Sequence, residues 1–132
     1  MERVNTSGKR KSAVASAVIE EGNGKVTVNK IPLDIYTPEL ARLKIQEPLG
    51  LASDKADRVN IRVTVKGGGV MGQAAAARTA IARGLVDFFK DEELETMFKN
   101  YDRTLLINDD RRKLPKNQLG HGARAKKQKS YR

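Results

Sequence analysis

Hydrophobic and polar residues alternate most regularly over residues 59–66, where valine or isoleucine occupies every second position. A period of two is typical of a strand with one buried face, so this segment is predicted to be a β-strand. Two further β-prone runs, residues 13–20 and 25–29, flank Gly22-Asn23-Gly24. Glycine and asparagine favour tight turns between strands, and the two runs are therefore predicted to pair as a hairpin.

Downstream of this strand the apolar positions change to steps of three and four residues. Over residues 72–90 this spacing predicts a long helix with one apolar stripe, and the many alanines allow it to lie close to a sheet. The stripe consists of Ala74, Ala77, Ile81, Leu85 and Phe88. Asp91 is expected to cap the N-terminus of a further helix. The apolar residues of that helix are Leu94, Met97, Phe98 and Tyr101. Tyr36 and Tyr101 are both expected in the core.

The remaining segments complete an α+β pattern. Thr37 is expected to cap a short helix that has Pro38 at its first position and is closed by Pro48 and Gly50. Residues 105–107 (Leu-Leu-Ile) predict a last short strand. The predicted elements follow one another as hairpin, helix, strand, two helices and strand. This order within 132 residues predicts one domain with a two-layer α+β sandwich.

The charge of the chain is concentrated at its two ends. The formal net charge is +10, yet residues 12–110 hold 13 basic and 15 acidic residues. The first eleven residues carry four basic residues and one acidic residue, and the chain from Arg111 onward carries nine basic residues and no acidic one. A charge that served solubility alone would be spread over the surface, so the ends are predicted to meet a polyanion. They lack the apolar stripe or lipidation site of a membrane-binding segment, which favours nucleic acid.

The amino-acid composition of the chain changes at Asp109. Pro115, Gly120 and Gly122 interrupt it, and no apolar periodicity remains for packing. We therefore expect a globular α+β domain over residues 1–108 and an extended basic tail over residues 109–132 that is disordered in the free protein. About 20 extended residues span roughly 60 Å, which exceeds the radius of the domain. If about six to ten phosphates are bound, affinity is expected to fall ~10³–10⁵-fold between about 50 and 200 mM salt.

The glycines that follow the predicted strand have several interpretations. Gly67, Gly69 and Gly72 match the G-x-G-x-x-G pattern of a dinucleotide site between a strand and a helix. The acidic residue that such a site requires after the next strand is missing, and Gln73 and Ala74 replace the Lys and Ser/Thr of a P-loop. A small-molecule kinase loop of the galactokinase–homoserine kinase type would contain serines, and this loop has none. Two interpretations stay open: a helix N-terminus that binds an RNA phosphate, and a tight turn without a ligand.

Little in the sequence predicts an enzyme. His121 is the only histidine and lies in the tail, and the chain has no cysteine for disulfides or thiolate metal sites. The acidic residues from Asp91 to Glu95 fit the first turn of a helix better than a metal site. We therefore expect no cofactor, no metal and no small-molecule substrate. No apolar run approaches the ~20 residues of a membrane span, so a cytoplasmic location is expected.

Several motifs resemble those of one known family. They are Gly8-Lys9-Arg10-Lys11-Ser12-Ala13-Val14-Ala15, Val65-Lys66-Gly67-Gly68-Gly69, Gly72-Gln73-Ala74, Ile81-Ala82-Arg83-Gly84-Leu85, Asp110-Arg111-Arg112, Gly122-Ala123-Arg124 and Gln128-Lys129-Ser130-Tyr131-Arg132. In type and spacing they resemble universal small-subunit ribosomal protein nine, the S-nine family, over the length of the chain. The ending resembles the archaeal and eukaryotic branch. The chain departs from the family pattern within residues 113–127, where Lys127 replaces a frequent aromatic residue.

The resemblance implies a fold and a place in the cell. The fold would be that of the second domain of ribosomal protein S-five, a mixed four-stranded sheet with helices packed on it and a left-handed β-α-β crossover. The domain would lie in the head of the small ribosomal subunit, beside neighbouring head proteins, on the 3′ major domain of the 16S-type rRNA. The tail would reach the anticodon stem-loop of the P-site tRNA. A free-standing chromatin or RNA-chaperone protein is the alternative.

The resemblance also implies which residues bind RNA. The implied rRNA-binding residues are Lys9, Arg10, Lys11, Lys66, Gly67, Gly68, Gly69, Arg111, Arg112, Lys113, Lys116, Arg124, Lys126 and Lys127. The implied tRNA-binding residues are Lys129, Ser130, Tyr131 and Arg132.

Overall fold

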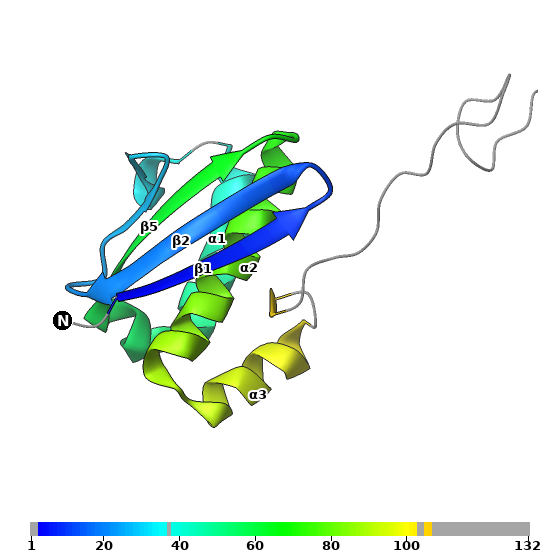
Figure 1. Ribbon diagram of the computed structural model, residues 1–132. Coiled ribbons are helices and arrows are strands. Elements are labelled where there is room, and N and C mark those ends of the chain that lie inside the picture. The colour runs from blue at the N-terminus through cyan, green and yellow to red at the C-terminus, as the bar shows by residue number, and fades with distance from the viewer. Residues whose placement is uncertain (1–2, 37, 103–104, 107–132) are drawn as a thin grey trace, which may run out of the picture.

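A mixed five-stranded sheet forms one layer of the molecule, and three helices form the other. The computed structural model describes residues 3–36, 38–102 and 105–106. The strands are β1 (Arg3–Arg10), β2 (Ala13–Glu21), β3 (Val26–Val28), β4 (Ile31–Pro32) and β5 (Val59–Lys66). The helices are α1 (Glu39–Ala52), α2 (Val70–Phe89) and α3 (Glu92–Tyr101), with the short 3-10 helices η1 (Leu33–Ile35) and η2 (Ser53–Arg58). Figure 1 shows α1 and α2 on the same side of the sheet. The predicted two-layer α+β class is confirmed.

The pairing of the strands differs from the predicted one. The sheet order is β1-β2-β5-β3-β4, so β2 pairs with β1 and β5, and the predicted hairpin between residues 13–20 and 25–29 is wrong. The Gly-Asn-Gly segment instead crosses the start of β5, where Gly22 N–H donates to Arg58 and Gly24 N–H donates to Val59. The Asn60 side chain accepts bonds from the N–H groups of Asn23 and Lys25 and holds this crossing in place. The segment therefore carries β3 to the far side of β5.

The sheet contains more strands than predicted. β1 was not predicted from the sequence, because it is mostly polar and its only buried residue is Gly8. β3 runs parallel to β5, and α1 lies between them in the chain, as a β-α-β crossover requires. The handedness of this crossover stays a prediction, as does the boundary at residue 109.

The core consists largely of small side chains where α2 meets the sheet. Ala13, Ala15 and Ala17 of β2 are fully buried, and the valine and isoleucine positions of β5 face the same side. The predicted stripe of α2 is buried from Ala74 to Leu85, and its last member, Phe88, is partly buried. A Cβ atom added to Gly8 would lie 2.4 Å from the carbonyl oxygen of Ala76, so α2 rests directly on β1.

Helix α1 is longer than predicted. It begins after Pro38, which is the N-cap residue, and Thr37 lies outside the described residues. It continues through Pro48 and Gly50 to Ala52, although a proline inside a helix removes one hydrogen bond. Pro48 is fully buried, and burial of its ring offsets part of that cost.

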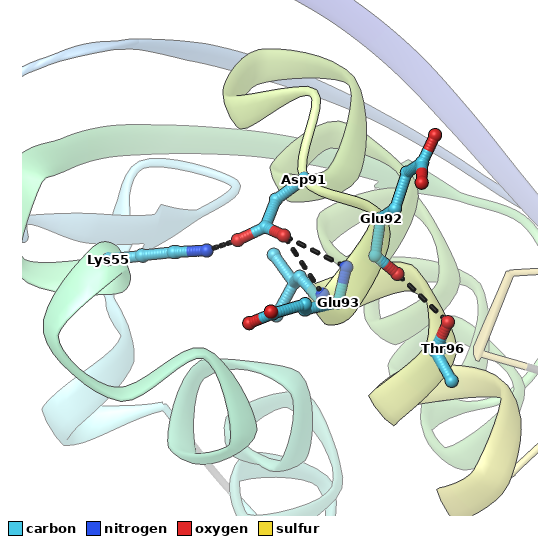
Figure 2. Close-up of polar contacts among 6 residues, drawn as sticks. Lys55, Asp91, Glu92, Glu93 and Thr96 are labelled. Carbon is cyan, nitrogen blue, oxygen red and sulfur yellow. Dashed lines mark hydrogen bonds and ion pairs between the residues drawn. The ribbon is translucent and has the colours of Figure 1, made fainter.

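Helix α3 begins at a well-formed cap. The Asp91 side chain accepts hydrogen bonds from Glu93 N–H at 2.9 Å and Leu94 N–H at 3.4 Å, as predicted for an N-cap. The same carboxylate pairs with Lys55 of η2, whose ammonium lies 5.9 Å from the centre of the Phe89 ring. Figure 2 shows Asp91 between Lys55 and the first turn of α3. The acidic residues here belong to a first turn, as expected.

Only half of the predicted apolar stripe of α3 is buried. Leu94 and Phe98 reach the core, whereas Met97 is 45% exposed and Tyr101 is 54% exposed. Tyr36 is buried as expected, and the core prediction for Tyr101 is wrong. Within the described part of the chain, α3 therefore contributes Leu94 and Phe98 to the core and leaves the other two residues of the stripe at the surface.

A buried arginine joins the three helices. The Arg78 side chain of α2 pairs with Glu47 of α1 at 2.7 Å and with Asp102, the C-cap of α3, at 2.9 Å. Leu105 follows in a turn closed on Asp102 and is fully buried. The predicted strand at residues 105–107 is therefore wrong for Leu105 and Leu106, and residue 107 lies outside the described residues.

We predict that Gly8→Ala destabilises the protein by ~1–3 kcal/mol, because its methyl group would meet main-chain atoms of α2 that have little room to move. Gly50→Ala is the matched control. Among the described residues, a Cβ added at Gly50 has no atom within 4 Å apart from its chain neighbours and the backbone of its own helix. Replacing this helical glycine should stabilise the protein by ~0.5–1 kcal/mol. Urea unfolding followed by circular dichroism measures both changes. Equal midpoints for Gly8→Ala and the unmodified chain would contradict the prediction.

Candidate nucleic-acid interface

Two basic segments that are far apart in the sequence meet at one end of the sheet. The turn between β1 and β2 consists of Lys11 and Ser12, and the loop between β5 and α2 consists of residues 67–69. The strand register places Lys9 opposite Val14 and Val14 opposite Lys66, so the two lysines flank β2 in one row. The pairing of β2 with both neighbours thus brings the turn beside the loop.

Glycine is required in this loop for two reasons. Gly67 and Gly68 have φ angles of 76° and 67°, which are unfavourable for residues with a side chain. A Cβ on Gly67 would also lie 2.5 Å from the carbonyl oxygen of Ser12. The main chain of the loop therefore lies directly against the β1–β2 turn. The loop is therefore a tight strand-to-helix turn. Both interpretations, a turn that binds an RNA phosphate and a turn without a ligand, stay open.

The N-terminus of α2 opens from the same loop. Its N-cap residue, Gly69, makes no side-chain capping bond, and the first turn contains no acidic residue. The Gln73 side chain donates to the carbonyl oxygen of Gly67 at 3.1 Å and fixes the loop against the helix. The first amides of a helix have no intrahelical acceptor and carry a partial positive charge, which favours an anion at this point.

These parts surround a hollow of about 320 Å³. Its lining consists of Arg10, Lys11, Ser12, Lys44, Gly68, Gly69, Met71, Gly72 and Ala75. Three cations line it beside the helix N-terminus, Arg10 and Lys11 from β1 and its turn and Lys44 from α1, and none of the described lining residues is a carboxylate. We call this set, together with Lys9, Lys66 and Gly67, the loop cluster. Its charge and exposed amides suit the phosphate groups of a nucleic acid.

The structure brings seven of the predicted rRNA-binding residues together. They are Lys9, Arg10, Lys11, Lys66, Gly67, Gly68 and Gly69. Lys44 was not predicted, because it lies within a helix and no local pattern distinguishes it from other surface lysines. All predicted site residues from Arg111 to Arg132 lie outside the described residues, as does His121, so their roles stay predictions.

Other kinds of site were also considered. Within residues 3–36, 38–102 and 105–106, no three histidine, cysteine or acidic residues are grouped so as to hold a metal ion. None of the helices described is long and apolar enough to cross a membrane.

Comparison with known proteins gives one consistent result. A family model described as ribosomal protein S9/S16 matches residues 8–132. The small ribosomal subunit protein uS9 of Thermoplasma volcanium is 59% identical over 132 residues, which is 100% of both chains. The protein of the same name from Thermoplasma acidophilum is 58% identical over 127 residues, or 96% of this chain and 98% of the relative. That from Methanothrix thermoacetophila is 49% identical over 132 residues, again 100% of both chains.

We predict that Gly67→Ala destabilises the protein by ~1–2 kcal/mol, because alanine is strained at a positive φ. The added methyl group would also push the loop away from Ser12. Gly69→Ala is the matched control in the same loop, since a Cβ there meets no atom of the described residues within 4 Å beyond its chain neighbours. Thermal unfolding of the two variants measures the difference. An equally large loss of stability for Gly69→Ala would contradict the explanation by the positive φ of Gly67 and its contact with Ser12.

Proposed function

The chain belongs to the ribosomal protein S9/S16 family and is a structural constituent of the small ribosomal subunit, and from this premise we propose how it binds RNA. The predicted family is confirmed, and the relatives fit its archaeal branch. The loop cluster binds phosphate groups of the 16S-type rRNA of the 3′ major domain in the head. The tail continues along the rRNA, and its last residues reach the P-site tRNA.

One observation carries the rRNA proposal. The fold gathers Arg10 of β1, Lys11 of the following turn and Lys44 of α1 around the N-terminus of α2, whose N-cap residue makes no side-chain capping bond. Phosphate contacts of this kind fix the position of a protein on RNA and do not read its sequence. They suit a constituent that must hold one place in a large RNA.

The family also bears on the other classes of function. Ribosomal proteins of this family are structural and not catalytic, which disfavours the kinase-like interpretation of the glycine loop. It also disfavours a free-standing chromatin or RNA-chaperone protein, because the family is one of small-subunit proteins in cytoplasmic ribosomes. Neighbouring proteins of the head are further partners.

We predict that Arg10→Gln/Lys11→Gln weakens binding to the rRNA 3′ domain and reduces its salt dependence. Each lost phosphate contact should lower the slope of log affinity against log salt by about 0.7–0.9. Filter binding between about 50 and 200 mM salt measures the slope. Lys90→Gln/Lys99→Gln removes the same charge from the C-cap residue of α2 and the last turn of α3, and it should leave the slope unchanged. The proposal fails if the two double variants behave alike.

The tail proposal concerns Lys129, Ser130, Tyr131 and Arg132. It is supported by the match of this ending to the family and by the nine basic residues from Arg111 onward. A mixed tail of arginine and lysine loses its conformational entropy only when it binds, so it would become ordered during assembly. Arginine at the tip offers a planar, bidentate donor to a phosphate of the anticodon stem-loop.

We predict that a chain without residues 130–132 still enters small subunits, and that these subunits bind P-site tRNA more weakly by roughly 10-fold or more. A single substitution, Arg132→Gln, should show part of the same loss. Arg112→Gln is its matched control and should leave tRNA binding to assembled subunits unchanged. Binding of labelled tRNA to purified subunits gives the affinities, and normal affinity of the truncated form would refute the tRNA contact.

A further inference from the structure

Within the part of the chain that the structure describes, no helix covers the second face of the sheet. The described helices lie on one side, and the uncovered side of β1, β2 and β5 faces the viewer in Figure 1. Burial alternates along β2 and β5, with the odd-numbered residues inside and the even-numbered residues on this open face. The register then defines four rows across the sheet. They are Lys9-Val14-Lys66, Ser7-Ser16-Thr64, Asn5-Val18-Arg62-Thr27 and Arg3-Glu20-Asn60.

These rows are strongly basic. They contain four cations and a single carboxylate, Glu20. Glu20 pairs with Arg3 at 2.9 Å and with Arg62 at 2.7 Å, so one negative charge is shared between two guanidinium groups. The row of Lys9 and Lys66 belongs to the loop cluster. The positive surface of that cluster therefore continues over the edge of the sheet onto the open face.

A hollow of about 540 Å³ lies on this face beside Arg62. Among the residues that the structure describes, its lining consists of Ser16, Val18, Thr27, Asn29, Lys30, Arg62, Val63 and Thr64, with two cations and no carboxylate. Asn29 accepts a bond from Val65 N–H at 2.9 Å and so holds the β3–β4 turn against β5. That turn carries Lys30, which is therefore fixed on the opposite side of the hollow from β2.

We propose that the open face is a second RNA-binding surface, which contacts the sugar-phosphate backbone beside the loop cluster. The hydroxyl and amide groups between the cations suit phosphate oxygens and 2′-hydroxyl groups. The rows contain no aromatic residue, so bases have no platform on which to stack. This inference rests on the proposed function in one respect: the RNA is the rRNA held by the loop cluster.

A protein partner fits this face less well. The cores of protein interfaces are apolar and poor in lysine and acidic residues. Val14 and Val18 are the only apolar side chains that β1, β2, β5 and β3 contribute to the rows, and they lie in different rows among charged and hydroxyl groups. Pro32 of β4, opposite Thr27, continues the row of Val18 at the edge of the sheet. Such a surface gives a protein little apolar area to bury, whereas every cation on it attracts phosphate.

The first test is the salt dependence of binding to the rRNA 3′ domain. Lys30→Gln/Arg62→Gln should lower the affinity and reduce the salt slope by about one to two. Lys90→Gln/Lys99→Gln is the control with the same loss of charge. Arg62 is highly exposed, and thermal unfolding checks that the variant remains folded. An unchanged slope for Lys30→Gln/Arg62→Gln, while Arg10→Gln/Lys11→Gln lowers it, overturns this inference alone. An unchanged slope for Arg10→Gln/Lys11→Gln overturns the proposed function instead.

The second test identifies the partner chemically. The chain contains no cysteine, so a single cysteine can carry a photo-crosslinker at one chosen position. Thr64→Cys lies on the open face, and Thr96→Cys, on exposed α3, is its control. In small subunits assembled with each full-length variant, the probe at position 64 should crosslink to rRNA more strongly than the probe at position 96. Crosslinks from position 64 to a protein, or none at all, would overturn the RNA assignment.

Discussion

The close contact between α2 and the first two strands is the constraint on which the rest of the structure depends. Alanines on both surfaces and Gly8 beneath the helix allow main chains to approach closely. Each small side chain buries little apolar area, but dense packing gives many favourable dispersion contacts. The same contact sets where α2 begins. With the helix at this distance, its N-terminus and the glycine loop lie against the β1–β2 turn, so the packing of the core and the geometry of the loop cluster have one cause.

Strong periodic patterns predicted β5, α2 and the cap of α3 from the sequence, and the failures have identifiable reasons. Burial patterns cannot reveal β1, because the residue it buries most fully is a glycine. The Gly-Asn-Gly segment after β2 predicts a turn from neighbouring residues alone. Strand pairing depends on β5, which is distant in the sequence and lies between β2 and β3 in the sheet. Pro48 looked like the end of a helix, yet tertiary burial of its ring outweighs its poor helix propensity.

The binding surfaces were predictable to different degrees. Motifs and charge predicted most of the loop cluster, since its residues adjoin glycines in recognisable segments. Lys44 and the open face required the three-dimensional structure, because Arg62 and Lys30 become neighbours only through the strand register and the β3–β4 turn.

Acidic residues gather at another part of the domain. Asp87, Asp91, Glu92 and Glu95 gather around the junction of α2 and α3, so the charge of the domain is polarised. A polarised domain approaches a polyanion with its basic end first.

Arg78 has a consequence for the chain beyond it. By binding Asp102 at the end of α3 and Glu47 of α1, it fixes the last described segment to the same body that carries the loop cluster. In the proposed function, the basic tail of residues 109–132 would then start from a fixed point on the domain. Each residue inserted or deleted along it would shift the reach of its tip by up to ~3.6 Å, about the spacing of neighbouring residues. Because the last residues have one proposed target, the length of the tail is then constrained, even at positions where substitution of the intervening residues is tolerated.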